Sequence, residues 1–260
     1  MTHLIVFGAA GRMGEKILEL ASRNGSFAIA GAVESQNHAS VGKKIHEGKL
    51  SITSNLSSLK NPDRVAIDFT APEATLSHLE IMSDWKKAAA VVGTTGFSDK
   101  QRAWIKEFAE KIPIVMSPNM SRGVNLMLKL AREAAKRLGD YDIEIIEAHH
   151  NQKKDAPSGT ALELAREIAE ELNGSPKADF VFGREGNVGA RTGKEIGIHA
   201  VRAGDIVGEH TVYFATGGER IEIRHVATSR EAFATGALHA AKWLIRQKPG
   251  LYSMKDVIRG

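Results

Sequence analysis

A glycine-rich turn between a strand and a helix constrains the fold of this chain more than any other feature. Residues 4–7 are a short apolar run typical of a strand, the segment GAAGRMG follows at residues 8–14, and apolar residues then recur at helical spacing. Glycines here allow a tight turn and let a pyrophosphate approach the backbone N–H groups at a helix N-terminus. Because the GxxGxxG spacing is less common than GxGxxG, it is the strand–turn–helix context that predicts a dinucleotide site.

An acidic residue follows at the distance that such a site requires. Residues 28–33 form a second apolar run, which ends at Glu34, twenty residues past Gly14. In dinucleotide-binding folds a carboxylate at this point accepts hydrogen bonds from the adenosine ribose hydroxyls. We therefore expect Glu34 to lie beside the glycine turn. The alternative is a plain glycine turn with a surface glutamate nearby.

Strand and helix patterns alternate through the first 120 residues, which predicts a parallel sheet with right-handed crossovers. Further strands are expected at residues 65–69, 88–92 and 112–116. Ligands bind at the carboxyl edge of such sheets, where the loops 68–70, 93–95 and 117–120 would gather. Three helix starts carry the S/T-x-x-E/Q pattern of a capping box, beginning at Thr70, Ser98 and Thr160.

The pattern changes after residue 120. A helix is expected over 123–138, a strand over 142–148, and a mobile glycine-rich loop over 183–194. Residues 196–202, 210–215 and 221–226 read as strands of a mixed or antiparallel sheet, since their apolar and polar residues alternate. A final helix over 231–246 is expected to pack on the first domain.

The run EAHHNQKKDAPSGTA, residues 147–161, carries the most chemistry. Histidine is the side chain that titrates near neutral pH, lysine can hold an anion or supply a proton, and free N–H groups at a helix start bind anions. These residue types could together bind a carboxylate of a ligand and donate a proton to the same ligand. The plainer interpretation is a solvated basic loop. His149 and His150 are not expected to bind a metal, because successive side chains of a strand point to opposite faces and no Cys or carboxylate set completes a site.

The composition of the chain argues against several classes of function, among them membrane proteins and nucleic-acid-binding proteins. The chain has 260 residues, no cysteine and a net charge of +4 that is dispersed along the sequence. No apolar run approaches the length of a membrane span, and the N-terminus leads directly into a strand, so neither a membrane segment nor a signal peptide is expected. No basic tract interleaved with aromatic residues is present, so nucleic acid is a poor candidate. We expect a cytoplasmic enzyme with small anionic ligands.

Taken together, these segments resemble the 4-hydroxy-tetrahydrodipicolinate reductase family of bacterial and plant lysine biosynthesis, also called dihydrodipicolinate reductases. The segments that carry the resemblance are GAAGRMG, DFTAPE, VVGTTGF, EAHHNQKKDAPSGTA and VRAGDIVGEHTV. The resemblance implies an α/β fold with a Rossmann-like nucleotide domain, residues 1–121 and 229–260. It also implies a central α+β domain with a mixed sheet, residues 122–228, for substrate binding and tetramer formation. The expected activity is NAD(P)H-dependent reduction of 4-hydroxy-tetrahydrodipicolinate to tetrahydrodipicolinate by a homotetramer in the diaminopimelate/lysine pathway.

The resemblance also implies roles for individual residues. His149 matches the proton donor/acceptor and Lys153 the second proton donor of the family. The substrate carboxylates are expected at His150, Ser158, Gly159 and Thr160. The nucleotide is expected at Gly8, Ala9, Ala10, Gly11, Arg12, Met13, Glu34, Gly93, Thr94, Thr95, Ser117, Pro118, Asn119 and Met120.

One departure from the family bears on the cofactor. Many members carry an arginine directly after the acid, where it meets the 2′-phosphate of NADPH, whereas this chain has Ser35 and Gln36. We therefore predict that NADH is used at least as well as NADPH. Arg12, Lys43 and Lys44 are the cations that the sequence cannot place.

Three alternatives stay open at this stage. The first is a related two-domain amino-acid dehydrogenase that acts on an acyclic substrate. The second is a non-catalytic nucleotide-sensing protein, and the third is a dehydratase that consumes no reductant.

Overall fold

The computed structural model describes residues 1–45, 47–60, 63–173, 179–193 and 195–259. The chain divides into two compact units, each with its own apolar core. Unit 1 comprises residues 1–122 and 230–260, and unit 2 comprises residues 123–229. No helix among the described residues is long and apolar enough to cross a membrane.

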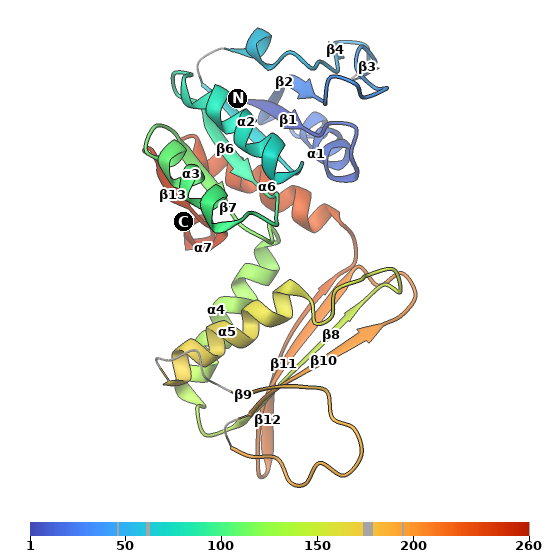
Figure 1. Ribbon diagram of the computed structural model, residues 1–260, viewed down its shortest axis with the longest axis vertical. Coiled ribbons are helices and arrows are strands. Elements are labelled where there is room, and N and C mark those ends of the chain that lie inside the picture. Colours follow the sequence, from blue (N-terminus) through green and yellow to red (C-terminus); the bar gives the residue numbers. More distant parts are fainter. Residues whose placement is uncertain (46, 61–62, 174–178, 194, 260) are drawn as a thin grey trace. The chain divides into compact units, whose positions relative to one another are not determined.

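Unit 1 is built on a six-stranded parallel sheet in the order β13-β7-β6-β5-β1-β2 (Figure 1). Its expected strands all form, with ends shifted by one or two residues, and β13 is an addition that the sequence did not predict. The strands are β1 (Thr2–Phe7), β2 (Phe27–Val33), β5 (Arg64–Asp68), β6 (Ala89–Val92), β7 (Pro113–Met116) and β13 (Gly250–Tyr252).

Helices cover both faces of this sheet, which is why its strands are apolar on both sides. In β1, Leu4 and Val6 face one core while Ile5 and Phe7 face the other, as the two-residue period of a strand requires. The first core is closed by α1 (Arg12–Arg23), α6 (Glu231–Leu244) and α7 (Met254–Arg259), and the second by α2 (Pro72–Ser83) and α3 (Asp99–Ala109). The final long helix thus packs on the first domain, as expected.

The segment between β2 and β5 holds short elements that have no periodic sequence pattern. They are β3 (Lys44–Ile45), β4 (Leu50–Ser51) and the 3-10 helix η1 (Leu56–Leu59). Val33 and Thr53 form an isolated parallel bridge, which attaches this segment to the end of β2.

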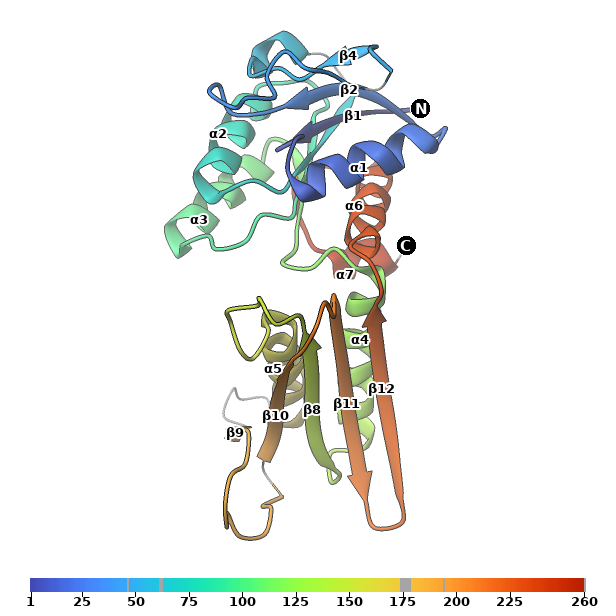
Figure 2. The same cartoon turned by 90° about the vertical axis from the view of Figure 1, so that its right-hand side faces the viewer.

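Unit 2 is a five-stranded mixed sheet in the order β12-β11-β8-β10-β9. Strand β8 runs parallel to β10 and antiparallel to β11. Figures 1 and 2 show both helices of the unit on one face of this sheet. The elements are α4 (Arg122–Arg137), β8 (Asp142–His149), α5 (Gly159–Asn173), β9 (Asp179–Phe182), β10 (Glu195–Arg202), β11 (Gly208–Thr216) and β12 (Glu219–Ala227). A parallel Rossmann-like sheet followed by a mixed sheet confirms the expected fold class.

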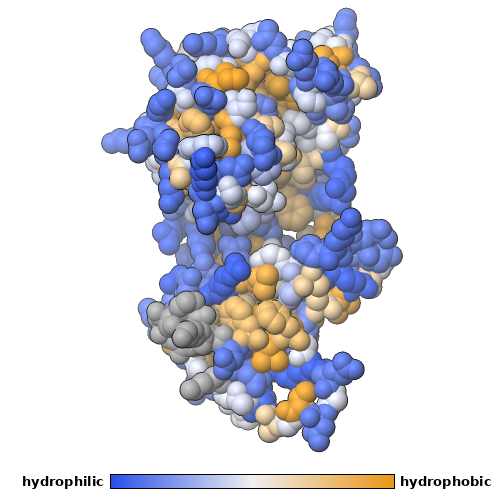
Figure 3. All heavy atoms as spheres, viewed as in Figure 1, coloured by the Kyte–Doolittle hydropathy of each residue, from blue (hydrophilic) through white to orange (hydrophobic). Residues whose placement is uncertain are grey.

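Among the described residues, no helix covers the other face of the mixed sheet. Because Ile143 and Ile145 pack against α4 and α5, the alternate residue Ile146 points away from them. By strand register, Val201 and Val226 lie on this same open face, and all three side chains are between 38% and 44% exposed. Figure 2 looks onto this open face, whereas Figure 3 has the view of Figure 1 and shows apolar atoms on another side of unit 2, among mostly hydrophilic side chains.

Only one of the three expected capping boxes forms. Ser98 accepts from the backbone N–H of Gln101 and the reciprocal bond is present. The box at Thr70 was wrong, because α2 begins at Pro72 with Ala71 as its N-cap and Thr70 bonds to Asp68 instead. The box at Thr160 was also wrong: Ser158 Oγ accepts from Ala161 N–H, so the helix starts earlier.

The glycine-rich segment after β9 is tied down at both ends. Arg184 donates to both carboxylate oxygens of Glu144, and Arg191 donates to Glu144 Oε1 and Asp142. Of the loop that was expected to be mobile, Lys194 lies outside the described residues. Its mobility stays a prediction.

Candidate active site

The glycine turn of unit 1 has the backbone that close approach to a ligand requires. Gly8 has φ +65°, in the left-handed region, and its carbonyl accepts a hydrogen bond from Gly11 N–H at 2.9 Å. A Cβ on Gly14 would lie 2.1 Å from that same carbonyl oxygen. The first turn of α1 therefore lies directly against the glycine turn, and the start of a helix is a place that favours an anion.

Glu34 lies beside this turn, as predicted. Its Oε1 accepts a hydrogen bond from Ala10 N–H at 2.8 Å, and its Oε2 accepts one from Ser35 N–H at 3.3 Å. A pocket of about 540 Å³ adjoins these groups. Among the polar residues that line it are Glu34, Ser35, Gln36, His38, Thr70 and His78. The turn and the carboxylate fit the pyrophosphate and ribose of a dinucleotide.

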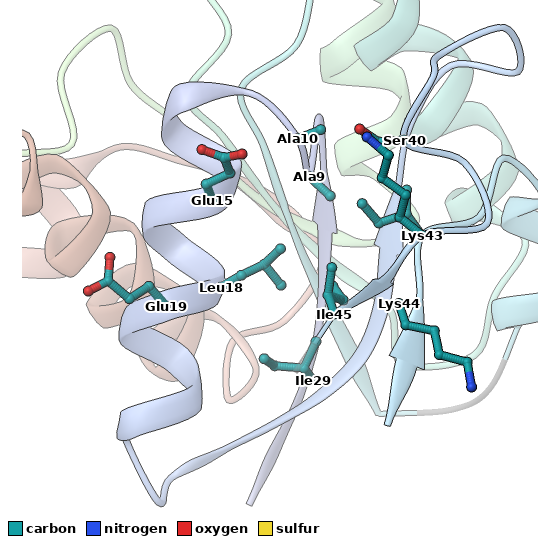
Figure 4. A pocket seen from close by; sticks show the side chains of 11 residues that line it. Ala9, Ala10, Glu15, Leu18, Glu19, Ile29, Ser40, Lys43, Lys44 and Ile45 are labelled. Carbon is teal, nitrogen blue, oxygen red and sulfur yellow. The ribbon is translucent and has the colours of Figure 1, made fainter. Parts of the chain in front are cut away.

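Lysines 43 and 44 line a separate pocket of about 380 Å³ on the other side of the glycine turn. Figure 4 shows Leu18, Ile29 and Ile45 between the acidic residues of α1 and these two lysines. Arginine and lysine are absent from the described lining of the Glu34 pocket. Lys43 and Lys44 thus line a different pocket from Glu34, and the two pockets share Ala10.

A buried carboxylate that the sequence did not single out organises the end of β5. Asp68 is 3% exposed; it accepts hydrogen bonds from the backbone N–H and the hydroxyl of Thr70 at 2.9 and 2.6 Å, and it pairs with His78 Nδ1 at 2.8 Å. The His78 ring stacks on Phe7 with a centroid separation of 3.9 Å. Thr94 also donates to Asp68, at 3.4 Å. The signal in the sequence was an acid at the carboxyl end of a strand, in DFTAPE.

The two remaining loops that are expected to contact the nucleotide follow β6 and β7. Gly93 N–H donates to Asp68 O at 2.8 Å, and a Cβ on Gly93 would lie 2.2 Å from the Phe69 ring. Ser117 Oγ donates to Asn119 O at 2.9 Å, so the loop 117–120 is closed internally. The side chain of Met120 is buried in the core, where it serves packing.

In unit 2, the buried carboxylate of Glu147 contacts two of the predicted site residues, His149 and Ser158. Glu147 is 0% exposed, and its Oε2 lies 2.6 Å from His149 Nδ1. Arg202 donates to both oxygens, at 2.7 and 2.8 Å, and Ser158 N–H donates to Oε1 at 3.0 Å. Burial alone would raise the pKa of Glu147, but these hydrogen bonds outweigh it and hold the pKa at about 2. The carboxylate is therefore ionised and connects His149 to the turn that opens α5.

His210 completes the buried cluster. Its Nε2 lies 2.9 Å from Ser158 Oγ, and its ring meets that of His149 edge-on with a centroid separation of 5.2 Å. Burial lowers the pKa of His210 to about 3, and the nearby His149 adds to this effect. The ring is neutral at physiological pH. Sequence reasoning did not assign Glu147, Arg202 or His210 a role, although all three lie in segments that carry the family resemblance.

The other predicted substrate residues lie on the loop between β8 and α5. Lys153 Nζ is paired with both carboxylate oxygens of Asp155, at 2.8 and 2.9 Å, and hydrogen bonding with Lys153 lowers the pKa of Asp155. Lys153 N–H donates to His150 O at 3.1 Å, and Gly159 and Thr160 form the first turn of α5. Within the described part of the chain, no group of three or more His, Asp and Glu side chains is arranged to hold a metal ion.

Comparison with known proteins decides the family. The family description "Dihydrodipicolinate reductase, N-terminus" matches residues 2–120, and "Dihydrodipicolinate reductase, C-terminus" matches residues 123–258. The chain belongs to the dihydrodipicolinate reductase family. The 4-hydroxy-tetrahydrodipicolinate reductase of Syntrophus aciditrophicus (strain SB) is 48% identical over 99% of this chain and 98% of its own. That of Geobacter sulfurreducens is 46% identical over 99% of each.

A solved structure of the same family agrees. The dipicolinate-bound dihydrodipicolinate reductase from Paenisporosarcina sp. TG-14 is 28% identical, with a TM-score of 0.81 over 98% of this chain and 99% of that one. The diaminopimelate dehydrogenase of C. glutamicum shares the fold alone, at 13% identity and a TM-score of 0.58. Membership of the family makes this chain an NAD(P)H-dependent oxidoreductase, so the resemblance inferred from the sequence is confirmed.

Proposed function

We propose that this chain reduces 4-hydroxy-tetrahydrodipicolinate to tetrahydrodipicolinate in the diaminopimelate/lysine pathway. The reaction adds one hydride and one proton to the substrate and releases one water. The observation that carries the proposal is the buried Glu147 carboxylate, which joins a histidine to the anion-binding start of a helix. The bound reduced nicotinamide supplies the hydride.

The residues of unit 2 carry out the two other tasks, which are proton donation and binding of the substrate carboxylates. His149 donates the proton that follows hydride arrival, since a histidine within reach of the substrate is suited to general acid catalysis. Lys153 is the second proton donor. His150, Ser158, Gly159 and Thr160 hold the carboxylates. We expect a substrate carboxylate to replace the Asp155 carboxylate as the partner of Lys153, because the two are chemically alike.

The test is an initial-rate assay of the full chain that follows both the substrate and the reduced nucleotide. We expect one nucleotide oxidised for each tetrahydrodipicolinate formed, and no comparable rate with acyclic oxo acids. Reduction of acyclic oxo acids at a similar rate would favour the amino-acid dehydrogenase alternative. Product formed without nucleotide oxidation would favour a dehydratase.

For the cofactor, we propose that NADH is used at least as well as NADPH. Glu34 can accept hydrogen bonds from the ribose 2′- and 3′-hydroxyls, whereas its charge repels a 2′-phosphate. The support is that Ser35 and Gln36 line the same pocket as Glu34, while Lys43 and Lys44 line the other one. The preference is measured as the ratio of kcat/KM for the two nucleotides.

We also propose a cytoplasmic homotetramer that forms through the mixed sheet of unit 2. The support is the open sheet face with its partly exposed Ile146, Val201 and Val226. Light scattering on the purified protein should give four times the chain mass. A Val201→Lys variant should give a smaller species, whereas an unchanged mass in that variant would place the interface elsewhere.

A further inference from the structure

Three groups converge on the Glu147 carboxylate from different parts of unit 2. They are the His149 ring from the end of β8, the Arg202 guanidinium from the end of β10, and the backbone N–H of Ser158 before α5. Arg202 supplies two of the four hydrogen bonds. Because a buried carboxylate with fixed donors has little freedom to turn, each partner is held in one orientation relative to the other two.

This arrangement determines which nitrogen of His149 is available. Nδ1 faces the ionised carboxylate at 2.6 Å and therefore carries a proton, so Nε2 is the nitrogen left for the substrate. The space in front of Nε2 is kept clear by a glycine: a Cβ on Gly208, at the start of β11, would lie 3.1 Å from it. Both observations point to Nε2 as the working atom.

We propose that Glu147 is a positioning residue for the reduction. It acts through His149, by holding Nδ1 and so fixing the ring with Nε2 toward the substrate. Glu147 also accepts a hydrogen bond from Ser158 N–H, and so fixes the position of the turn at Ser158–Thr160 relative to the His149 ring. The proposal rests on the reductase function above, in which His149 is the proton donor.

The groups around His149 are consistent with this role. Glu147 is the anion that faces the ring, Arg202 is the cation behind that anion, and the neutral His210 meets the ring edge-on. Lys153 lies on the following loop and is paired with Asp155. Removal of the Glu147 charge would leave Arg202 without its buried partner and His149 beside uncompensated positive charge.

The first test is Glu147→Gln in the full chain, with kcat and KM measured across pH. We expect kcat to fall roughly 10²-fold, with an unchanged KM for the nucleotide, because a general acid typically contributes roughly 10²–10⁴-fold. Glu147→Asp keeps the negative charge and should restore part of the rate.

The chain offers a matched control in Glu144, on the same strand but on the open face of the sheet. Its carboxylate is likewise bound by Arg184, Arg191 and His199, and these hydrogen bonds hold its pKa at about 2 although burial opposes them. Glu144→Gln removes a comparable carboxylate without touching His149. We expect the kcat of this variant to stay within twofold of the wild-type kcat at each pH measured.

Two further variants keep the proposal testable if Glu147→Gln does not fold. Gly208→Ala places a methyl group before Nε2 without altering the carboxylate, and should lower kcat at unchanged nucleotide KM. Arg202→Lys keeps the charge but loses the paired hydrogen bonds to Glu147, and should lower kcat at unchanged nucleotide KM, as Glu147→Gln does. Normal kinetics in both would overturn the proposal.

A double-variant cycle separates positioning from structure. If Glu147 acts through His149, Glu147→Gln should cost nothing further in a His149→Gln background. Full additivity of the two losses, or a Glu147→Gln profile that matches that of Glu144→Gln, would overturn the proposal. Absence of reductase activity in the wild type would instead overturn the proposed function.

Discussion

Acidification from pH 7 to pH 5 should destabilise unit 2 through the buried ring of His210. The buried ring has a pKa of about 3, against an ordinary value of 6.5 in the unfolded chain. Between these values the unfolded state binds a proton that the folded state does not, so the free energy of unfolding falls as the pH is lowered. For this histidine, stability is greatest above pH 6.5 and is lost progressively toward pH 3.

The size of the effect follows from the two pKa values. From pH 7 to pH 5, protonation of the unfolded chain at His210 removes about 2 kcal/mol of stability, and this figure requires only that the folded pKa lies well below 5. Burial also lowers the pKa of His225 in unit 2, which adds loss of the same sign, and that of His239, which belongs to unit 1. Glu147, whose pKa is lowered to about 2, contributes only below its ordinary range near 4.5.

The assay is urea unfolding at pH 7 and pH 5, at fixed protein concentration and ionic strength. The three tryptophans, Trp85, Trp104 and Trp243, all lie in unit 1, so their fluorescence follows unit 1 alone. Far-UV circular dichroism reports both units, and its change beyond the fluorescence transition reports unit 2. His210→Gln keeps a hydrogen-bonding partner for Ser158 and removes the titration. We expect the variant to lose about 2 kcal/mol less than the wild type between the two pH values. An equal loss in both proteins would refute the reasoning.

Three further predictions concern the reaction. His149→Gln should lower kcat roughly 10²–10⁴-fold with nearly unchanged nucleotide affinity, and a near-normal kcat would remove His149 from the mechanism. Lys153→Ala should lower the rate and weaken pyridine-2,6-dicarboxylate binding in calorimetry; if both stay normal, Lys153 is a surface lysine that serves only Asp155. Gln36→Arg should shift the kcat/KM ratio toward NADPH by supplying a bidentate phosphate partner beside Glu34, and an unchanged ratio would show that this side chain does not reach the 2′-phosphate.

The parts of the fold that could be predicted from the sequence depend on short-range patterns. Buried parallel strands are continuous apolar runs, and the glycine turn with its acid twenty residues later is a local signature. Glu34 and the glycine turn meet because β1 and β2 are neighbours in the sheet, which the βα pattern already implies. Strand β13 and helix α7 were missed because each is too short for a periodic pattern.

Helix starts were predicted less well, because a capping pattern competes with other partners for the same side chain. Thr70 has the sequence of a cap, yet the nearby Asp68 carboxylate accepts its hydroxyl. At α5, Ser158 lies two residues before Thr160 and caps the helix first. The sequence alone does not show which of several hydrogen-bonding partners a capping side chain will take.

The buried part of the candidate site could not be predicted, since it depends on contacts that are distant along the chain. Arg202 reaches Glu147 across 55 residues and His210 reaches Ser158 across 52. Both contacts exist because β10 and β11 flank β8, and that order of strands is not written in any local pattern. The sequence indicated which segments matter, and the sheet order shows how they meet.

The most direct test of the account is the stoichiometry of the wild-type reaction. Purified protein is given freshly prepared 4-hydroxy-tetrahydrodipicolinate with NADH, and nucleotide oxidation is compared with tetrahydrodipicolinate formed. The account predicts one nucleotide oxidised for each product molecule, with turnover lost in His149→Gln. Product without nucleotide oxidation, or full turnover in that variant, would contradict it.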